Sequence, residues 1–280
     1  MSKDPYKATW VSHSSIGDFI KCPRAYFLHN VYKDPKTKRK INIVNPALAL
    51  GVAVHEVLEG LAKYKTEERF NHSLFDDLDK VWKKVSGKKG GFKSELEEAQ
   101  VKDRAKNMIQ RALDNREPLD KKIIKIKEGD NGLPPNFYLS EEENIILCGK
   151  IDWLIWKPED DSLHILDFKT GKNEENEDSL QLPIYQLLLK NLQKRKVTSA
   201  SYWYLDKDDK PIDVVLPDLD DSFNRVYDIA MKVKQAREIG EFYCPRGDEG
   251  CFACRPFEKI IRGKAEYIGV GEMKQDLYMV

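Results

Sequence analysis

Apolar side chains in the first half of the chain recur at the spacing of helical turns. The clearest case is ALALGVAVHEVLEGLAKY, residues 47–64, where one face carries Leu50, Val54, Val57 and Leu61. Two further helices are predicted in this half, over residues 75–85 and 94–115. The first half is therefore expected to be mainly helical.

Another helix is predicted close to the N-terminus. Ser14 or Ser15 is the expected cap, because serine oxygens accept the free N–H groups of a first helical turn. Asp18 lies three residues after Ser15, where it completes a capping box. From this start the helix is expected to run toward Asn30.

The pattern changes to short β-rich runs after Pro134 and Pro135. Two amphipathic helices are also predicted in this half, over residues 180–194 and 222–239. The predicted strands cover residues 136–139, 144–147 continuing through 151–156, 163–168, and a hairpin of 202–205 with 212–216. We therefore predict an α/β fold with a central mixed sheet flanked by helices, an inserted helical lobe and a C-terminal tail that carries cysteines.

Composition narrows the class of protein less than the pattern does. The 280 residues are 41% hydrophobic, which fits one folded domain over 1–280 with a helical insertion at 65–130. Lys+Arg and Asp+Glu both number 47, so net charge indicates no polyanionic partner. The N-terminus lacks the apolar core of a signal peptide, and no apolar run reaches membrane-spanning length. We expect a cytoplasmic protein without a membrane partner.

The stretch GKIDWLIWKPEDDSLHILDFKTGK contains the most informative chemistry. Asp152 lies in one predicted strand, and strand alternation places Asp167 and Lys169 on the same face of the next. Two carboxylates opposite a lysine suit phosphodiester hydrolysis, with a divalent cation polarising the phosphate and the lysine acting on the attacking water. An isolated D-x-K triplet more often ends a strand and forms ion pairs, but Gly149 and the Thr170–Gly171 turn favour a metal-binding hairpin here.

Two helices offer further polar side chains for this site. His55 follows Gly51 by one helical turn, and an imidazole beside carboxylates favours manganese over magnesium. Gln181 and Tyr185 are also one turn apart and can present an amide and a phenol to a phosphate. Each pair alone is equally compatible with an ordinary packed helix face.

These motifs, in this order, resemble those of RecB-like nucleases of the PD-(D/E)XK superfamily. The family pattern is G-x-x-x-H, G-x-x-D, D/E-x-K and Q-x-x-x-Y, and this chain has all four. The resemblance implies a restriction-endonuclease-like core in which His55, Asp152, Asp167 and the Phe168 carbonyl bind Mg²⁺ or Mn²⁺. It also implies that Lys169 acts on water, and that Gln181 and Tyr185 support the phosphate or the lysine.

Four of the five cysteines are candidates for a second metal site. Cys148 is expected to be a small core residue. Related nucleases of the AddB and CRISPR-adaptation type carry a 4Fe-4S cluster on one early and three late cysteines. This chain departs from the family's tail spacing, with Ile260 where a cysteine is usual. The resemblance implies a cluster, with structural zinc as the alternative, on Cys22 paired with the tail region 240–262, through Cys22, Cys244, Cys251 and Cys254.

The resulting hypothesis is a metal-dependent deoxyribonuclease, in particular an exonuclease acting on single strands or duplex ends. The resemblance implies a role in recombination, repair, replication or CRISPR adaptation, with DNA as substrate and a helicase or other proteins of those pathways as partners. One alternative is a non-catalytic nucleic-acid-binding subunit with the same fold and a structural metal. A zinc-stapled interaction protein is the other. The motifs leave strand polarity and oligomeric state open.

Overall fold

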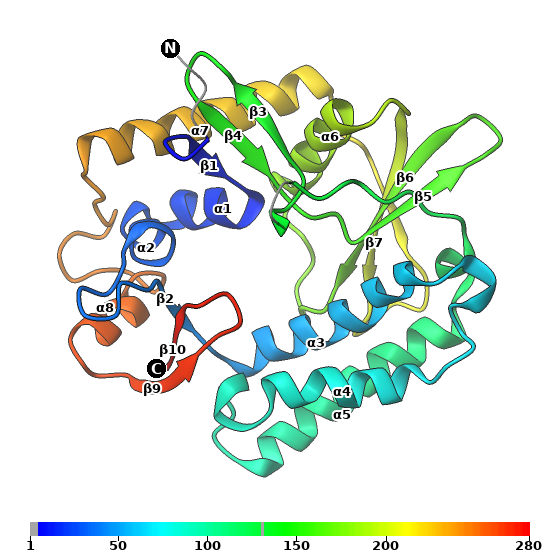
Figure 1. The fold of residues 1–280 in the computed structure, drawn as a ribbon, viewed down its shortest axis with the longest axis horizontal. Coiled ribbons are helices and arrows are strands. Elements are labelled where there is room, and N and C mark those ends of the chain that lie inside the picture. Colours follow the sequence, from blue (N-terminus) through cyan, green and yellow to red (C-terminus); the bar gives the residue numbers. More distant parts are fainter. Residues whose placement is uncertain (1–4, 130–131) are drawn as a thin grey trace.

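A four-stranded mixed sheet lies at the centre of the computed structural model, which describes residues 5–129 and 132–280 (Figure 1). The strand order is β5-β6-β7-β8; β5 and β8 are antiparallel to their neighbours, and β6 is parallel to β7. The strands are β5 (Trp153–Lys157), β6 (Ser162–Lys169), β7 (Val197–Tyr204) and β8 (Ile212–Val214).

Helices cover both faces of this sheet because successive side chains along each strand point to opposite faces. Leu166 and Phe168 belong to the apolar cluster of α3, α4 and α5, whereas Leu163 and Ile165 belong to that of α6 and α7. The helices are α3 (Pro46–Gly60), α4 (Leu74–Val85), α5 (Glu95–Asp114), α6 (Gln181–Leu192) and α7 (Leu219–Ile239). The α/β prediction and these five helices are confirmed.

In the part of the chain that the structure describes, the strands form three small sheets, whereas the sequence predicted one. Residues 149–152 separate β4 from β5, so the expected continuous run is wrong: β4 joins β1 and β3 instead. Short strands near both chain ends were also missed. The missed strands are β1 (Thr9–Val11), β2 (Ile41–Ile43), β9 (Glu266–Val270) and β10 (Asp276–Met279). The strands predicted over 136–139 and 144–147 are confirmed as β3 (Asn136–Ser140) and β4 (Ile145–Cys148).

The predicted N-terminal helix is interrupted at Cys22. Helix α1 (His13–Lys21) is capped by Ser12, not by Ser14 or Ser15, and Ser15 completes the capping box in place of Asp18. Cys22 is extended, as the residue before a proline prefers, and α2 (Pro23–Tyr26) begins directly after it. A π-helical turn over Phe27–Val31 follows. The break turns the Cys22 side chain away from the helical path.

The C-terminal segment of the chain lies beside these first helices (Figure 1). Helix α8 (Arg255–Ile261) lies near α2, and the Arg24 guanidinium is 2.5 Å from the Glu258 carboxylate. β10 pairs in parallel with β2, which leads into α3. Within the described residues, no helix has the length and apolar character needed to cross a membrane. The division into a core and an inserted lobe at 65–130 stays a prediction, because α4 and α5 share one apolar cluster with α3.

Candidate active site

The predicted polar residues come together between α3, α6 and the ends of β5 and β6. Helix α3 contributes His55 and Glu59, and Asp152 lies just before β5. One ligand atom from each of these three residues lies within 4.8 Å of the other two. The neighbouring side chains are Asp167 and Lys169 from β6, and Gln181 and Tyr185 from α6.

His55 is held between two carboxylates. Its Nδ1 is 3.2 Å from Glu59 Oε1 and 3.3 Å from Asp152 Oδ2, which also accepts a hydrogen bond of 2.9 Å from the Phe168 backbone N–H. Burial lowers the pKa of His55, but hydrogen bonds and charge from Asp152 and Glu59 outweigh burial and raise this pKa to about 10. The space between His55, Glu59 and Asp152 therefore attracts positive charge, which the proton on His55 supplies. A metal ion bound there would displace that proton.

Asp167 lies on the opposite face of β6 from Phe168 and faces α6. Its Oδ1 accepts hydrogen bonds from Gln181 Nε2 (2.8 Å) and the Tyr185 hydroxyl (3.2 Å). The side chain is almost fully buried, and burial together with the Asp152 charge raises the pKa of Asp167 to about 7. Among the described residues, the group of three side chains close enough to share a metal ion contains Glu59 and not Asp167. Glu59 is therefore a candidate ligand that the sequence did not predict.

Lys169 extends from β6 on the same side as Asp167, as strand alternation predicted. Its Nζ is 2.8 Å from Asp167 Oδ2 and 2.9 Å from Glu175 Oε2, and it donates to Gln181 Oε1. Burial lowers the pKa of Lys169, but Asp167 and Glu175 outweigh burial, so the net pKa is above its ordinary value. Lys169 is therefore a cation here, which suits it to attract a phosphate rather than to remove a proton.

Two motif glycines permit close approach between the elements that form the site. A Cβ at Gly149 would lie 2.9 Å from Leu188 Cδ1 of α6, so a larger residue there would force the Leu188 side chain to move. A Cβ at Gly51 would lie 3.3 Å from Thr170 Oγ1. The small residue on α3 thus makes room for Thr170 in the turn after Lys169.

Two carboxylates of this site were not assigned a role from the sequence. Glu59 carried a signal, because it lies one helical turn after His55 on the same face. Glu175 carried none, since it lies in the acidic run 174–178, which has the composition of a solvated loop. Its contact with Lys169 depends on how the segment between β6 and α6 folds back.

The four candidate cysteines form a second cluster, between α1, α2 and the C-terminal tail. One sulfur from each of them lies within 4.8 Å of the other three, and all four side chains are buried. Burial raises the pKa of the Cys22 thiol. Burial acts the same way on Cys251, but backbone N–H groups of Cys254 and Ala253 outweigh it and lower that pKa. The members are Cys22, Cys244, Cys251 and Cys254; Ile260 is buried in α8 and takes no part.

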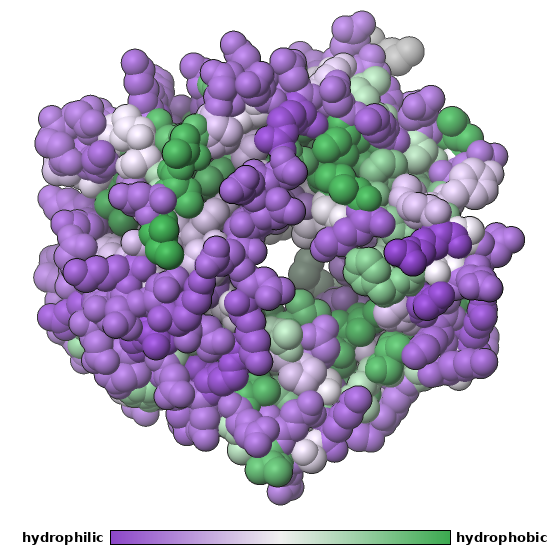
Figure 2. All heavy atoms as spheres, turned by 180° about the vertical axis from the view of Figure 1, so that it is seen from behind, coloured by the Kyte–Doolittle hydropathy of each residue, from purple (hydrophilic) through white to green (hydrophobic). Residues whose placement is uncertain are grey.

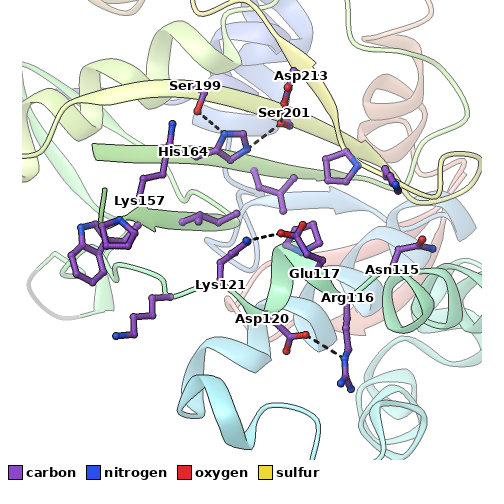
Figure 3. A pocket seen from close by; sticks show the side chains of 18 of the residues that line it. Asn115, Arg116, Glu117, Asp120, Lys121, Lys157, His164, Ser199, Ser201 and Asp213 are labelled. Atoms are coloured by element: carbon purple, nitrogen blue, oxygen red, sulfur yellow. Dashed lines mark hydrogen bonds and ion pairs between the residues drawn. The ribbon is translucent and has the colours of Figure 1, made fainter. Parts of the chain in front are cut away.

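One cavity among the described residues lies away from the carboxylate–lysine site. It has a volume of about 1430 Å³ and opens on the other end of the sheet, where the His164 ring lies between the Ser199 and Ser201 hydroxyls (Figure 3). A smaller cavity of about 620 Å³ reaches Glu59 and Asp152 and is lined largely by apolar residues. Two carboxylates of the candidate site therefore border the smaller cavity.

A mixed α/β fold that brings carboxylates and a buried lysine together has the groups that metal-dependent phosphodiester hydrolysis requires. A family model described as the PD-(D/E)XK nuclease superfamily matches residues 10–257. Because the match covers most of the chain, the protein belongs to this superfamily. The matched range includes every candidate site residue and all four clustered cysteines, and this range ends before β9 and β10. The search of curated proteins found no match.

Proposed function

We propose that the protein is a Mg²⁺- or Mn²⁺-dependent DNA nuclease that hydrolyses phosphodiester bonds. The observation that carries this proposal is the juxtaposition of two unlike groups: the acidic cluster of His55, Glu59 and Asp152, and the Lys169 cation beside Asp167. An acidic cluster attracts a divalent cation, and a buried ammonium attracts a phosphate. Phosphodiester cleavage uses both attractions at the same phosphorus.

The donor set fits a divalent cation. Carboxylate oxygens suit Mg²⁺ and Mn²⁺, and an imidazole shifts the preference toward Mn²⁺. Asp152 Oδ2 is held by the Phe168 N–H, and His55 by both neighbouring carboxylates, so these donors are already oriented. His55, Glu59, Asp152, Asp167 and the Phe168 carbonyl would hold the ion, which would polarise the phosphate and activate water.

The remaining side chains organise the phosphate and its surroundings. The Lys169 ammonium would pair with a non-bridging phosphate oxygen, where negative charge grows as the bond is attacked. Gln181 bridges Lys169 and Asp167, and Tyr185 donates to Asp167, so α6 fixes both charged groups relative to β6. We assign Gln181 and Tyr185 to this positioning role.

The substrate we propose is DNA with an unpaired strand or an end. Figure 2 shows an opening through the middle of the molecule, and in Figure 1 this place lies between α1, α3 and the central sheet. An unpaired strand in this opening would pass α3, the helix that carries His55. Resemblance to RecB-like enzymes adds support, and makes a helicase or another repair or CRISPR-adaptation protein the expected partner.

The test uses end-labelled single-stranded DNA, duplex DNA and RNA with Mn²⁺, Mg²⁺ or EDTA. We expect products from single-stranded DNA with either metal, more with Mn²⁺, and none with EDTA. The ladder of products distinguishes trimming from an end from internal cutting. Cleavage of RNA alone would replace the substrate class, and binding without cleavage under every condition would favour the non-catalytic subunit.

We also propose that the four cysteines hold one structural metal centre. Four thiolates accept either zinc or a 4Fe-4S cluster. Around a single zinc ion, with Zn–S bonds of about 2.3 Å, the sulfurs lie about 3.8 Å apart. Cys251 Sγ and Cys254 Sγ are 3.8 Å apart. A cluster needs wider spacing, because its irons and sulfides lie between the thiolates, so the geometry favours zinc although the resemblance implied a cluster.

A further inference from the structure

The Lys169 ammonium is fully engaged in the substrate-free protein. An ammonium has three N–H donors, and three side-chain acceptors surround this one. Asp167 Oδ2 and Glu175 Oε2 are 2.8 Å and 2.9 Å from Nζ, and Gln181 Oε1 is the third acceptor. The Tyr202 ring centre is 4.6 Å from Nζ. A phosphate oxygen can therefore reach this cation only by replacing an acceptor.

The three acceptors differ in how firmly the fold holds them. Asp167 is buried in β6 and bonded to α6, and Gln181 begins α6 and bonds to Asp167 in turn. Glu175 lies in the segment between these elements, and its side chain is 23% exposed. Its backbone N–H donates to the Tyr204 hydroxyl at 3.0 Å. The Glu175 side chain is thus the most exposed of the three acceptors, while its backbone is anchored.

We propose that the Glu175 carboxylate occupies the position at Lys169 that a backbone phosphate of the nucleic acid takes, and that the substrate must displace it. A carboxylate and a phosphodiester each present a single negative charge and oxygen acceptors, so they compete for the same ammonium. Glu175 then acts as a filter, because only a ligand with an anionic backbone can take its place. This inference rests on the proposed function, since it gives the site a nucleic acid as substrate.

The test measures binding without cleavage. A fluorescent single-stranded DNA is titrated with protein in EDTA, and its anisotropy gives the dissociation constant. Glu175→Gln keeps the shape of the side chain and removes the charge that competes, so it is expected to tighten binding about tenfold, the size of one charged hydrogen bond. The matched control is Glu177→Gln, the same change at an exposed position of the same loop. It should tighten binding by no more than about threefold, roughly the effect of removing one surface charge.

A double-mutant cycle separates competition at Lys169 from general charge repulsion. In a Lys169→Met background, Glu175→Gln should have no larger effect than Glu177→Gln. An equal gain in both backgrounds, or no gain in the wild-type background, would overturn the inference even if the protein cuts DNA. A gain that depends on Lys169 in a protein that cuts no nucleic acid would overturn the proposed nuclease activity and leave the inference intact.

Discussion

Replacing Asp167 with asparagine is expected to slow DNA cleavage by at least about a hundredfold, the usual cost of losing one electrostatic group from an active site. Asparagine keeps the size of the side chain and an oxygen that can accept from Gln181 and Tyr185. It lacks the negative charge that a divalent cation and Lys169 require. Single-turnover rates with Mn²⁺ measure the effect. Asp103→Asn, which changes an exposed carboxylate on α5, is the control, and an Asp167→Asn rate within tenfold of wild type would contradict the assigned role.

The same substitution should make the metal-free protein more stable at pH 8. Burial and the Asp152 charge raise the pKa of Asp167 to about 7 in the folded protein, whereas an unfolded aspartate titrates near pH 4, at about 3.9. The folded state therefore binds this proton more tightly, and stability falls as the pH rises from about 4 to about 7. Asparagine, which resembles the protonated acid, avoids this loss.

Thermal melting in EDTA at pH 4 and pH 8 tests the sign of this effect. The gain in melting temperature from Asp167→Asn should be small at pH 4 and larger at pH 8. Asp103→Asn, the same change at an exposed position, is the control. An equal change at both values, or a loss of stability confined to pH 8, would mean that Lys169 and His55 compensate the buried charge fully. A more stable but inactive variant would identify Asp167 as a residue held for function at a cost in stability.

The chain elements that the sequence predicted well are those whose periodicity is long and uninterrupted. Helix α3 buries Leu50, Val54 and Val57, and Leu61 is buried just after its end, as the pattern indicated, because one face of a long helix must lie on the core. β1 and β2 were missed because three residues are too few to show alternation. The break at residues 149–152 was missed because both flanking runs are apolar, and only tertiary pairing assigns them to different sheets.

Within the candidate site, the sequence predicted the residues that share one element better than the contacts between elements. Residues two, three or four positions apart on one element could be assigned to a common face, which is why Asp167 with Lys169, and Gln181 with Tyr185, were predicted together. Contacts between elements required the structure. Glu175 reaches Lys169 across an irregular segment, and Glu59 joins Asp152 from another element. Local spacing thus predicts which residues share a face, and the fold decides which charges meet.

The four-cysteine centre explains why two distant parts of the chain can form one folded unit. Cys22 lies at the break between α1 and α2, and the other three cysteines lie beyond α7, so a shared ion would link the N-terminal helices to the tail. The Arg24–Glu258 ion pair and the pairing of β2 with β10 connect the same two regions. A shared metal ion would add bonds from four thiolates to these contacts.

Cys254→Ala is therefore expected to cause the largest loss of stability. Cys254 is fully buried, and its sulfur accepts the Cys251 backbone N–H at 3.2 Å. Structural zinc contributes on the order of 10 kcal/mol to a small domain. Losing one of four ligands should cost at least about 3 kcal/mol, which lowers the melting temperature by roughly 6 °C or more in a chain of this size. We expect about one zinc per wild-type chain, from the four-thiolate geometry, and less in the variant.

Cys148→Ala is the matched control, because Cys148 lies in β4 outside the cluster and donates only a weak hydrogen bond of 3.5 Å to the Val11 carbonyl. It should keep the metal and nearly all of the stability. A strong chelator should lower the melting temperature of the wild type and of Cys148→Ala toward that of Cys254→Ala, which should itself respond little. Iron with visible absorption in place of zinc would identify a cluster. An unchanged melting temperature and metal content in Cys254→Ala would show that these cysteines do not join the chain ends through a metal.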